Sequence, residues 1–178
     1  VDNDKVYPTY SRRAQFYIDH DWYLDADEHL PVHKDTPLIG GDHRFQITGG
    51  HPRHSIHSIH QSQPTLMKLH RGQPVMHIND RNALEMGIAD GDEIRVWNDF
   101  SDFEITARIS PSVRPNQVIV YMWEGYQFKN WKVYDRLLIG IPKALHFAGG
   151  YGQLRYYFYN GSPSPSTDRG VRVSIEKI

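Results

Sequence analysis

Six short hydrophobic runs follow one another along the chain, and turn residues separate each run from the next. Over 103–109, apolar side chains alternate with Glu104, Thr106 and Arg108, which is the period of a half-buried β-strand. The run over 118–123 is continuously apolar, as expected of a strand that is buried on both faces. The pattern predicts strands over 45–48, 74–78, 93–98, 103–109, 118–123 and 170–175.

Two short helices are predicted between these strands. Asp80 is placed to cap a helix over 81–86, and Gly87 is placed to end it. Apolar residues recur at helical spacing over 131–139, which predicts a second helix there. The chain is therefore expected to be mainly β with short helices, packed as a barrel or sandwich rather than as alternating β and α units.

The first 43 residues differ in kind from the rest, because they are rich in aromatic and acidic side chains and show no sustained helical period. Aromatic side chains are unfavourable in water, so this segment is expected to pack along the following domain or along a neighbour that this sequence lacks. We divide the chain into an extended leader over 1–43 and a β domain over 44–178. The Gly-, Ser- and Pro-rich stretch over 161–166 is expected to be a surface loop.

Composition and charge exclude several classes of function. Lys and Arg number 20 and Asp and Glu number 21, so a net charge of -1 removes the broad attraction on which nonspecific nucleic-acid binding depends. The absence of cysteine excludes disulfides, thiolate nucleophiles and an iron–sulfur cluster held by this chain. The longest stretch without a charged residue, 54–67, is shorter than the ~20 residues of a membrane-spanning helix, so no direct membrane insertion is expected. The start lacks both Met and a signal-peptide pattern, which suggests a fragment or a processed chain.

The densest chemical feature is the segment 48–60, where a predicted strand runs into a glycine pair and then into four His residues at a spacing of three. One interpretation is a metal site, although this spacing on a strand would place the rings on alternate sides. A second is an ordinary polar loop. A third is a site for an anion and a heterocycle, in which Gly49 and Gly50 let backbone N–H groups approach the ligand and Arg53 adds a donor suited to phosphate.

The order of motifs along nearly the whole chain resembles the C-terminal domain of the dimethyl sulfoxide reductase family of molybdenum enzymes, which bind molybdopterin guanine dinucleotide. It is nearest the branch of nitrate reductase, selenate reductase, dimethyl sulfide dehydrogenase and ethylbenzene dehydrogenase catalytic subunits. The motifs are Thr48-Gly49-Gly50-His51, Leu69-His70-Arg71-Gly72 through Asn79-Asp80, Asp90-Gly91-Asp92 and Gly149-Gly150-Tyr151-Gly152, with Ser11-Arg12-Arg13 and Leu30-Pro31-Val32 in the leader.

The resemblance implies a double-psi β-barrel of the aspartate decarboxylase type that covers one side of the cofactor and supplies neither a metal ligand nor a catalytic residue. It assigns cofactor contacts to three parts of the chain: the segment after the first strand, the polar pair before the predicted helix, and a late loop. Those residues are Thr48, Gly49, Gly50, His51, Arg53, Ser55, His57, Ser58, Asn79, Asp80, Gln153, Tyr157 and Asn160.

The same resemblance implies a larger assembly. The chain would hold bis-molybdopterin guanine dinucleotide, with molybdenum or tungsten, for oxygen-atom transfer, hydroxylation or dehydrogenation with two-electron transfer. Upstream domains of the same subunit would carry any iron–sulfur cluster, an iron–sulfur electron-transfer subunit would be the partner, and this chain by itself would be inactive. The resemblance favours the periplasm or outer face over the cytoplasmic face. Two alternatives stay open: a free-standing β-barrel module for a nucleotide or anion, and a divalent-metal binder built on the His run.

Overall fold

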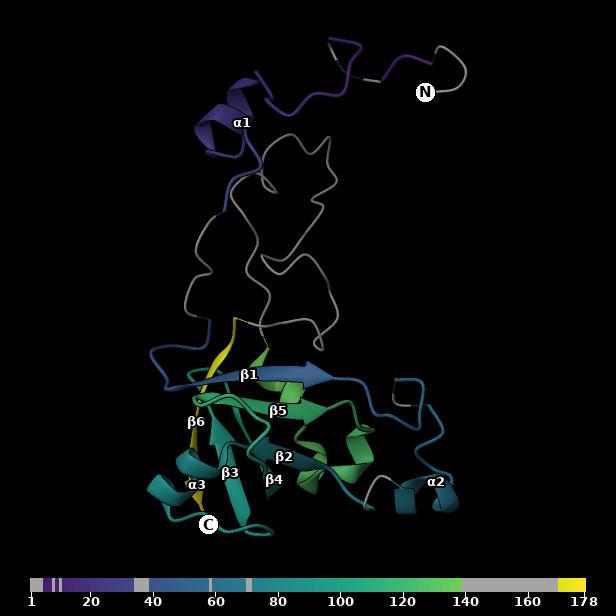
Figure 1. The fold of residues 1–178 in the computed structure, drawn as a ribbon, viewed down its shortest axis with the longest axis vertical. Coiled ribbons are helices and arrows are strands. Elements are labelled where there is room, and N and C mark those ends of the chain that lie inside the picture. The colour runs from purple at the N-terminus through teal and green to yellow at the C-terminus, as the bar shows by residue number, and fades with distance from the viewer. Residues whose placement is uncertain are drawn as a thin grey trace. The chain divides into compact units, whose positions relative to one another are not determined.

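The computed structural model describes residues 5–7, 9, 11–33, 39–57, 59–69, 72–138 and 170–178 (Figure 1). Of the described residues, 5–33 fall in one compact unit and 39–138 and 170–178 fall in another, and each unit is described by itself. The β domain is a closed barrel with the strand order β1-β5-β2-β4-β3-β6. Its strands are β1 (Phe45–Gly50), β2 (Val75–Ile78), β3 (Glu93–Trp97), β4 (Asp102–Ile109), β5 (Gln117–Tyr121) and β6 (Arg172–Lys177). The prediction of a mainly β domain with short helices is confirmed, and all six predicted strands are present.

The barrel mixes parallel and antiparallel pairs. β1 runs parallel to β5, and β2 runs parallel to β4, while the other four pairings are antiparallel. Alternate side chains of each strand point into one core, as in β4, where Phe103, Ile105 and Ala107 are buried. The period of two seen in the sequence therefore corresponds to the inside and outside of a barrel.

The helix α3 (Asp80–Met86) connects β2 to β3, and its first residue corrects a prediction. The N-cap is Asn79 rather than Asp80: the Asn79 side chain accepts hydrogen bonds from the backbone N–H groups of Arg81 and Asn82. Asp80 lies in the first helical turn, where its carboxylate also accepts from Arg81 N–H. Gly87 ends the helix in the left-handed conformation, with φ 66°, as predicted.

The predicted helix over 131–139 is wrong in the described part of that range. Within it lie the end of the 3₁₀ helix η2 (Lys129–Trp131) and the 3₁₀ helix η3 (Tyr134–Leu137), and a further 3₁₀ helix, η1 (Gly125–Gln127), precedes them. Trp131 has φ 57° and Val133 is extended, so no α-helix can pass through them. Tyr134 and Leu137 both reach the core at a spacing of three, which one 3₁₀ turn supplies as well as an α-helix does. A further helix, α2 (Pro64–Leu69), was not predicted.

The described residues 5–33 include one short helix, α1 (Asp21–Asp25), within the segment predicted to be extended. The His20 ring accepts a hydrogen bond from Trp22 N–H and caps this helix. Several large hydrophobic side chains of the leader are exposed, among them Phe16 at 76% and Val32 at 56%. None of the helices in the described part of the chain is long and apolar enough to cross a membrane.

Candidate functional site

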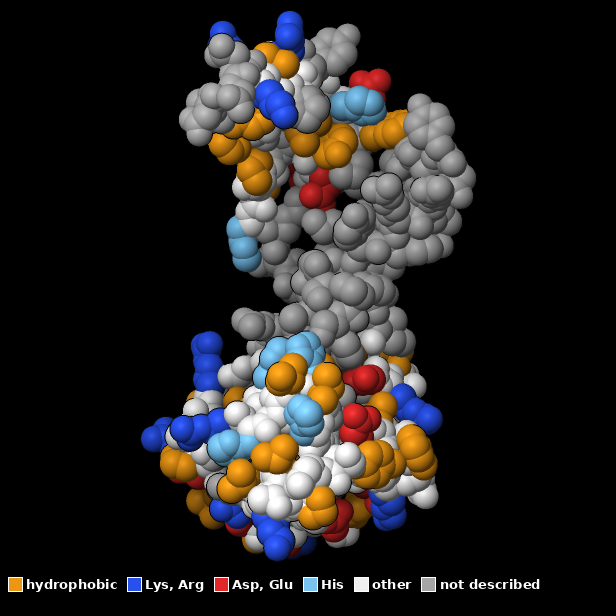
Figure 2. All heavy atoms as spheres, turned by 90° about the vertical axis from the view of Figure 1, so that its right-hand side faces the viewer, with side chains coloured by type: hydrophobic (Ala, Val, Ile, Leu, Met, Phe, Trp, Pro, Cys, Tyr) orange, Lys and Arg blue, Asp and Glu red, His pale blue; other side chains and the backbone are white. Residues whose placement is uncertain are grey.

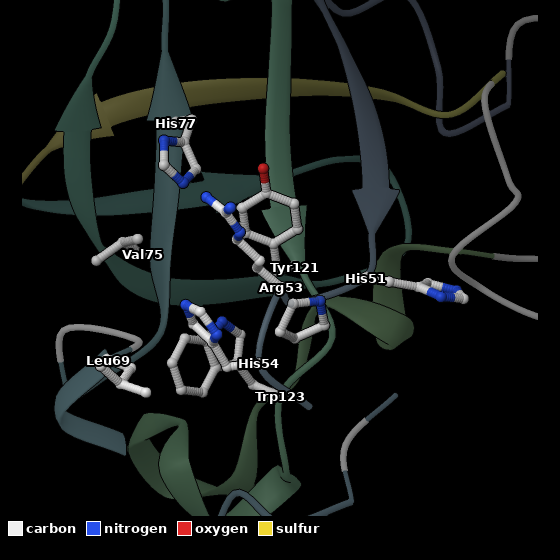
Figure 3. Close-up of a pocket in the computed structure, with 9 residues that line it drawn as sticks. His51, Arg53, His54, Leu69, Val75, His77, Tyr121 and Trp123 are labelled. Carbon is white, nitrogen blue, oxygen red and sulfur yellow. The ribbon is translucent and has the colours of Figure 1, made fainter. Parts of the chain in front are cut away.

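A cavity of about 330 Å³ opens at one end of the barrel, where β1 and β5 finish and β2 begins (Figure 3). We call this the cavity end. The lining side chains come from the loop after β1, the last residue of α2, strand β2 and the end of β5. They are His51, Pro52, Arg53, His54, Leu69, Val75, His77, Tyr121 and Trp123.

One wall of the cavity depends on a glycine. Gly50 is paired with Tyr121 across β1 and β5, and a Cβ atom on Gly50 would lie 2.7 Å from two atoms of the Tyr121 ring. The absence of a side chain therefore lets the ring lie across the end of β1. His77 meets the same ring edge-on, with a centroid separation of 5.3 Å and an interplanar angle of 72°. The result is an aromatic wall that combines a phenol and an imidazole (Figure 3).

The first residues of the loop over 51–63, 51–54, form another part of the lining. Arg53 and His54 line the same cavity as Tyr121 and Trp123, and in the view of Figure 3 the Arg53 side chain overlaps the Tyr121 ring. The His51 ring points away from this group and lies against His57, with ring centroids 4.5 Å apart. The loop thus places the Arg53 guanidinium and the His54 imidazole at the cavity, while His51, which also lines it, packs against His57.

The loop backbone has an irregular path. His57 and His60 have positive φ angles of 54° and 72°, and Ile59 N–H donates to Ile56 O in a tight turn. Ser55 Oγ donates to His57 O at 3.0 Å. The regular spacing of the His residues therefore does not place their rings on one side. Within the described residues, no three His, Asp or Glu side chains gather as a metal site.

The charges of the cavity suit an anionic ligand with a flat ring. Of the described residues that line it, one is Arg and three are His, and none is Asp or Glu. Guanidinium and imidazole N–H groups donate to phosphate, whereas aromatic faces stack on heterocycles. Several His and hydrophobic side chains are also exposed where the barrel is seen from the side of the loop and α2 (Figure 2).

The opposite end of the barrel is built differently. We call it the asparagine end, because Asn79, Asn82 and Asn116 lie there, at the end of β2 and before the start of β5. Asn79 is 4% exposed, and its side-chain amide donates to Val113 O at 2.7 Å in addition to capping α3. Asn82 accepts from Asn116 N–H at 2.7 Å. Arg44, just before β1, is held there by Glu85 and by Asn116 Oδ1.

The structure brings some of the predicted site residues together and separates others. His51 and Arg53 line the cavity, and Ser55 and His57 follow them in the same loop. Gly49 and Gly50 end β1, and Gly50 pairs with the lining residue Tyr121. Thr48 lies within β1, where its hydroxyl accepts from the Gln117 side chain at 2.8 Å. Asn79 and Asp80 follow the other end of β2, with Asn79 two residues beyond His77, and neither residue lines the cavity. Four of the predicted contacts lie outside the described residues: Ser58, Gln153, Tyr157 and Asn160. The assigned cofactor contacts, in and outside the described residues, stay predictions.

Of the nine lining residues only His51 and Arg53 were among the predicted contacts, and the seven others include His77, Tyr121 and Trp123. His77 is the one ionisable residue in the apolar run of β2, and Tyr121 and Trp123 are aromatic residues at the end of a buried strand. A polar or aromatic residue at the end of a hydrophobic strand is thus the signal that sequence reasoning had available. This signal does not show which other strand the residue will lie beside in the barrel.

The amino-acid sequence is similar to a known protein family and to several larger proteins. A family profile described as "Molydopterin dinucleotide binding domain" matches residues 45–140. The respiratory nitrate reductase subunit alpha of Haloferax mediterranei is 33% identical over 182 residues, which cover 99% of this chain and 18% of that protein. The perchlorate reductase subunit alpha of Dechloromonas aromatica is 31% identical over 189 residues, which cover 99% of this chain and 19% of that protein.

A solved structure supports the fold. Acetylene hydratase from Pelobacter acetylenicus matches with a TM-score of 0.56 at 11% identity, over 76% of this chain and 21% of that one. The chain spans less than a fifth of the length of the nitrate and perchlorate reductase subunits that it matches.

Proposed function

The chain belongs to the molybdopterin dinucleotide-binding domains of the dimethyl sulfoxide reductase family, and from this premise we propose that its cavity end holds part of molybdopterin guanine dinucleotide. The observation that carries the proposal is the cavity itself, in which Arg53 faces the aromatic wall of Tyr121 and His77. A guanidinium beside flat rings suits a ligand that combines phosphate with a heterocycle.

The donor set and the size of the cavity fit one half of such a cofactor. A volume of about 330 Å³ is near the lower limit of small-molecule sites, so it accommodates one ring system rather than the whole dinucleotide. Arg53 would bind a phosphate oxygen, and the Tyr121 ring would stack on the heterocycle. The bare backbone of Gly49 and Gly50 would let N–H groups approach the pyrophosphate. Ser58, Asn79, Asp80, Gln153, Tyr157 and Asn160 stay candidate contacts for the remainder of the cofactor.

The barrel would supply placement and electrostatics. When bound, the cofactor supplies two-electron redox chemistry of the kind used in oxygen-atom transfer, hydroxylation or dehydrogenation. The chain's own residues would exclude water from one face of the ring and neutralise phosphate charge with Arg53. The two parallel pairs, β1 with β5 and β2 with β4, in a closed six-stranded barrel support the double-psi arrangement.

The wider proposal is that the chain is the C-terminal cofactor-binding domain of a molybdenum oxidoreductase catalytic subunit. Its support is that the chain matches a small part of alpha subunits named as nitrate, chlorate and perchlorate reductases and as dimethylsulfide dehydrogenase. Upstream domains would complete the active site, so the chain by itself would be inactive. We propose an iron–sulfur electron-transfer subunit as partner and the outer face of the membrane as location.

Guanosine diphosphate tests the cavity directly, because it carries both a heterocycle and a pyrophosphate. In an NMR titration of the 178-residue chain, backbone amides of 49–53 and Tyr121 are expected to shift. Arg53→Gln is expected to weaken binding about tenfold, the loss of one charge-assisted contact worth ~1.4 kcal/mol. Arg44→Gln is the matched control, because it removes an arginine already paired with Glu85 and should leave binding unchanged. Shifts confined to the asparagine end, or equal losses in both variants, would contradict the proposal.

A further inference from the structure

We propose that Gln61 is a positioning residue: its buried amide fixes the loop over 51–63 to the end of β5 and so sets the width of the cavity. Gln61 was not among the predicted site residues, and it does not line the cavity. It is 2% exposed, one of the largest fully buried side chains of the domain. The expected effect of Gln61 on ligand affinity rests on the proposed function, whereas its expected effect on the position of the loop does not.

The amide of Gln61 bonds to the backbone on both sides of Trp123. Its Nε2 donates to Met122 O at 2.6 Å, and its Oε1 accepts from Glu124 N–H at 2.8 Å. Glu124 N–H also donates to Gln127 Oε1 at 3.0 Å, so it keeps a partner if Gln61 is replaced. Among the described residues, no other side chain donates to Met122 O. A single side chain thus pairs with the strand end much as a further β-strand would.

Beyond Pro52, which is buried next to the end of β1, hydrophobic burial does little to anchor the described part of this loop. Its two large aliphatic side chains, Ile56 and Ile59, are 64% and 55% exposed. Two of its residues, His57 and His60, hold left-handed backbone angles that are unfavourable for non-glycine residues and persist only when neighbouring contacts hold them. Gln61 lies directly after His60, and its Nε2 also approaches His57 O at 3.4 Å. Its amide is therefore placed to hold the strained turn.

Both walls of the cavity depend on this contact. Arg53 and His54 belong to the loop. Tyr121 and Trp123 belong to the end of β5 and the residues after it, to which Gln61 hydrogen-bonds at Met122 and Glu124. If the amide bonds are lost, the loop can move away from β5 without disturbing the core, since its aliphatic side chains are already in water. The separation of Arg53 from the Tyr121 ring would then no longer be fixed.

Gln61→Met tests this inference, because Met fills a similar volume but makes neither hydrogen bond. Asn98→Leu is the matched control. Asn98 is 6% exposed, and its amide likewise bonds to backbone on both sides, donating to Leu137 O at 3.0 Å and accepting from Phe100 N–H at 3.0 Å, in the turn between β3 and β4. Both variants replace a buried amide with an apolar side chain of similar size.

Hydrogen exchange of the 178-residue chain gives the first readout. In Gln61→Met, the amides of Ile59 and Met122 are expected to exchange at least about tenfold faster, while Ala83 in α3 keeps its wild-type rate. Asn98→Leu should leave Ile59 and Met122 unchanged. Unchanged exchange in Gln61→Met would overturn the proposal. So would an equal increase throughout the barrel or unfolding of the chain, since Gln61 would then be a general stability residue.

Guanosine diphosphate binding gives the second readout. Gln61→Met is expected to raise the dissociation constant about tenfold and Asn98→Leu to change it less than about twofold. Equal affinity of Gln61→Met and wild type would overturn the role in setting the cavity. If the wild-type chain does not bind guanosine diphosphate, the proposed function fails, and the exchange pattern of Ile59 and Met122 still decides whether Gln61 positions the loop.

Discussion

The two ends of the barrel use similar polar side chains for opposite purposes. At the asparagine end, Arg44 is paired with Glu85, and the Asn79 and Asn82 side chains bond to the protein's own backbone. At the cavity end, Arg53 is exposed, and in the described part of the chain it has no carboxylate partner. Polar groups that the fold has already satisfied stabilise the domain, whereas those that face an open cavity stay available to a ligand.

The sharpest way to break this distinction is at Asn79, which is both a predicted nucleotide contact and the observed helix cap. Asn79→Ala removes the cap of α3 and the bond to Val113 O, so it is expected to lower the free energy of unfolding by ~2 kcal/mol. Thermal denaturation should show a midpoint several degrees lower, and guanosine diphosphate affinity should not change. Weaker binding with unchanged stability would mean that Asn79 contacts the nucleotide after all.

A smaller effect is expected at Gly50, where a side chain would enter the cavity wall. The Cβ of Gly50→Ala would lie 2.7 Å from the Tyr121 ring, so the ring must shift, at a cost of ~1 kcal/mol. Binding of guanosine diphosphate should weaken, as measured by the same NMR titration. In the double variant with Tyr121→Ala, the glycine substitution should no longer lower stability, because the clashing ring is gone. Simple additivity of the two changes in a denaturation experiment would refute this account.

The smallest expected effect is a dependence of stability on pH through Glu85 at the asparagine end. Hydrogen bonds from Arg44 and then Asn82, with the charge of Arg44, lower the pKa of Glu85 below its usual value. A lowered folded-state pKa contributes stability above the unfolded-state pKa and loses it as the pH falls through the folded-state value. Urea denaturation of Glu85→Gln should therefore show a slightly lower midpoint than wild type at pH 6, with the two converging toward pH 3. Parallel curves across this range would show that Glu85 contributes nothing through its charge. Arg53 lacks such a partner among the described residues, and Arg53→Gln should show no comparable trend.

The elements that local pattern determines were predictable. Alternating side chains such as Phe103 and Ile105 give the strands, and Gly87 gives the end of α3, because each depends on a period or a turn within a few residues. The choice of Asn79 over Asp80 as cap was not predictable, since both side chains can accept the same bonds. The left-handed angle at Trp131 carried no sequence signal, because such angles are usual for Gly and Asn rather than Trp.

The site was predictable only where it is contiguous. The segment from Gly49 to Arg53 is visible in the sequence, but its partners Tyr121 and His77 are 44 residues apart from each other and become neighbours only through the antiparallel register of β2 and β5. Gln61 looked like one polar loop residue among several. Its burial depends on the path of the loop, which no local propensity specifies.

The strand order means that the barrel cannot close during synthesis until its last strand is available. β6 pairs with both β1 and β3, so it closes the ring although its residues, 172–177, are the last of the six strands to be synthesised. While the ribosome is still producing the chain, β1 and β3 each present an unpaired edge that another nascent chain can bind. Closure has to bring together residues more than 120 positions apart, as in the pairing of Phe45 with Val173, which makes it a slow step. Chaperones that shield strand edges would therefore act on this domain until its final strand emerges.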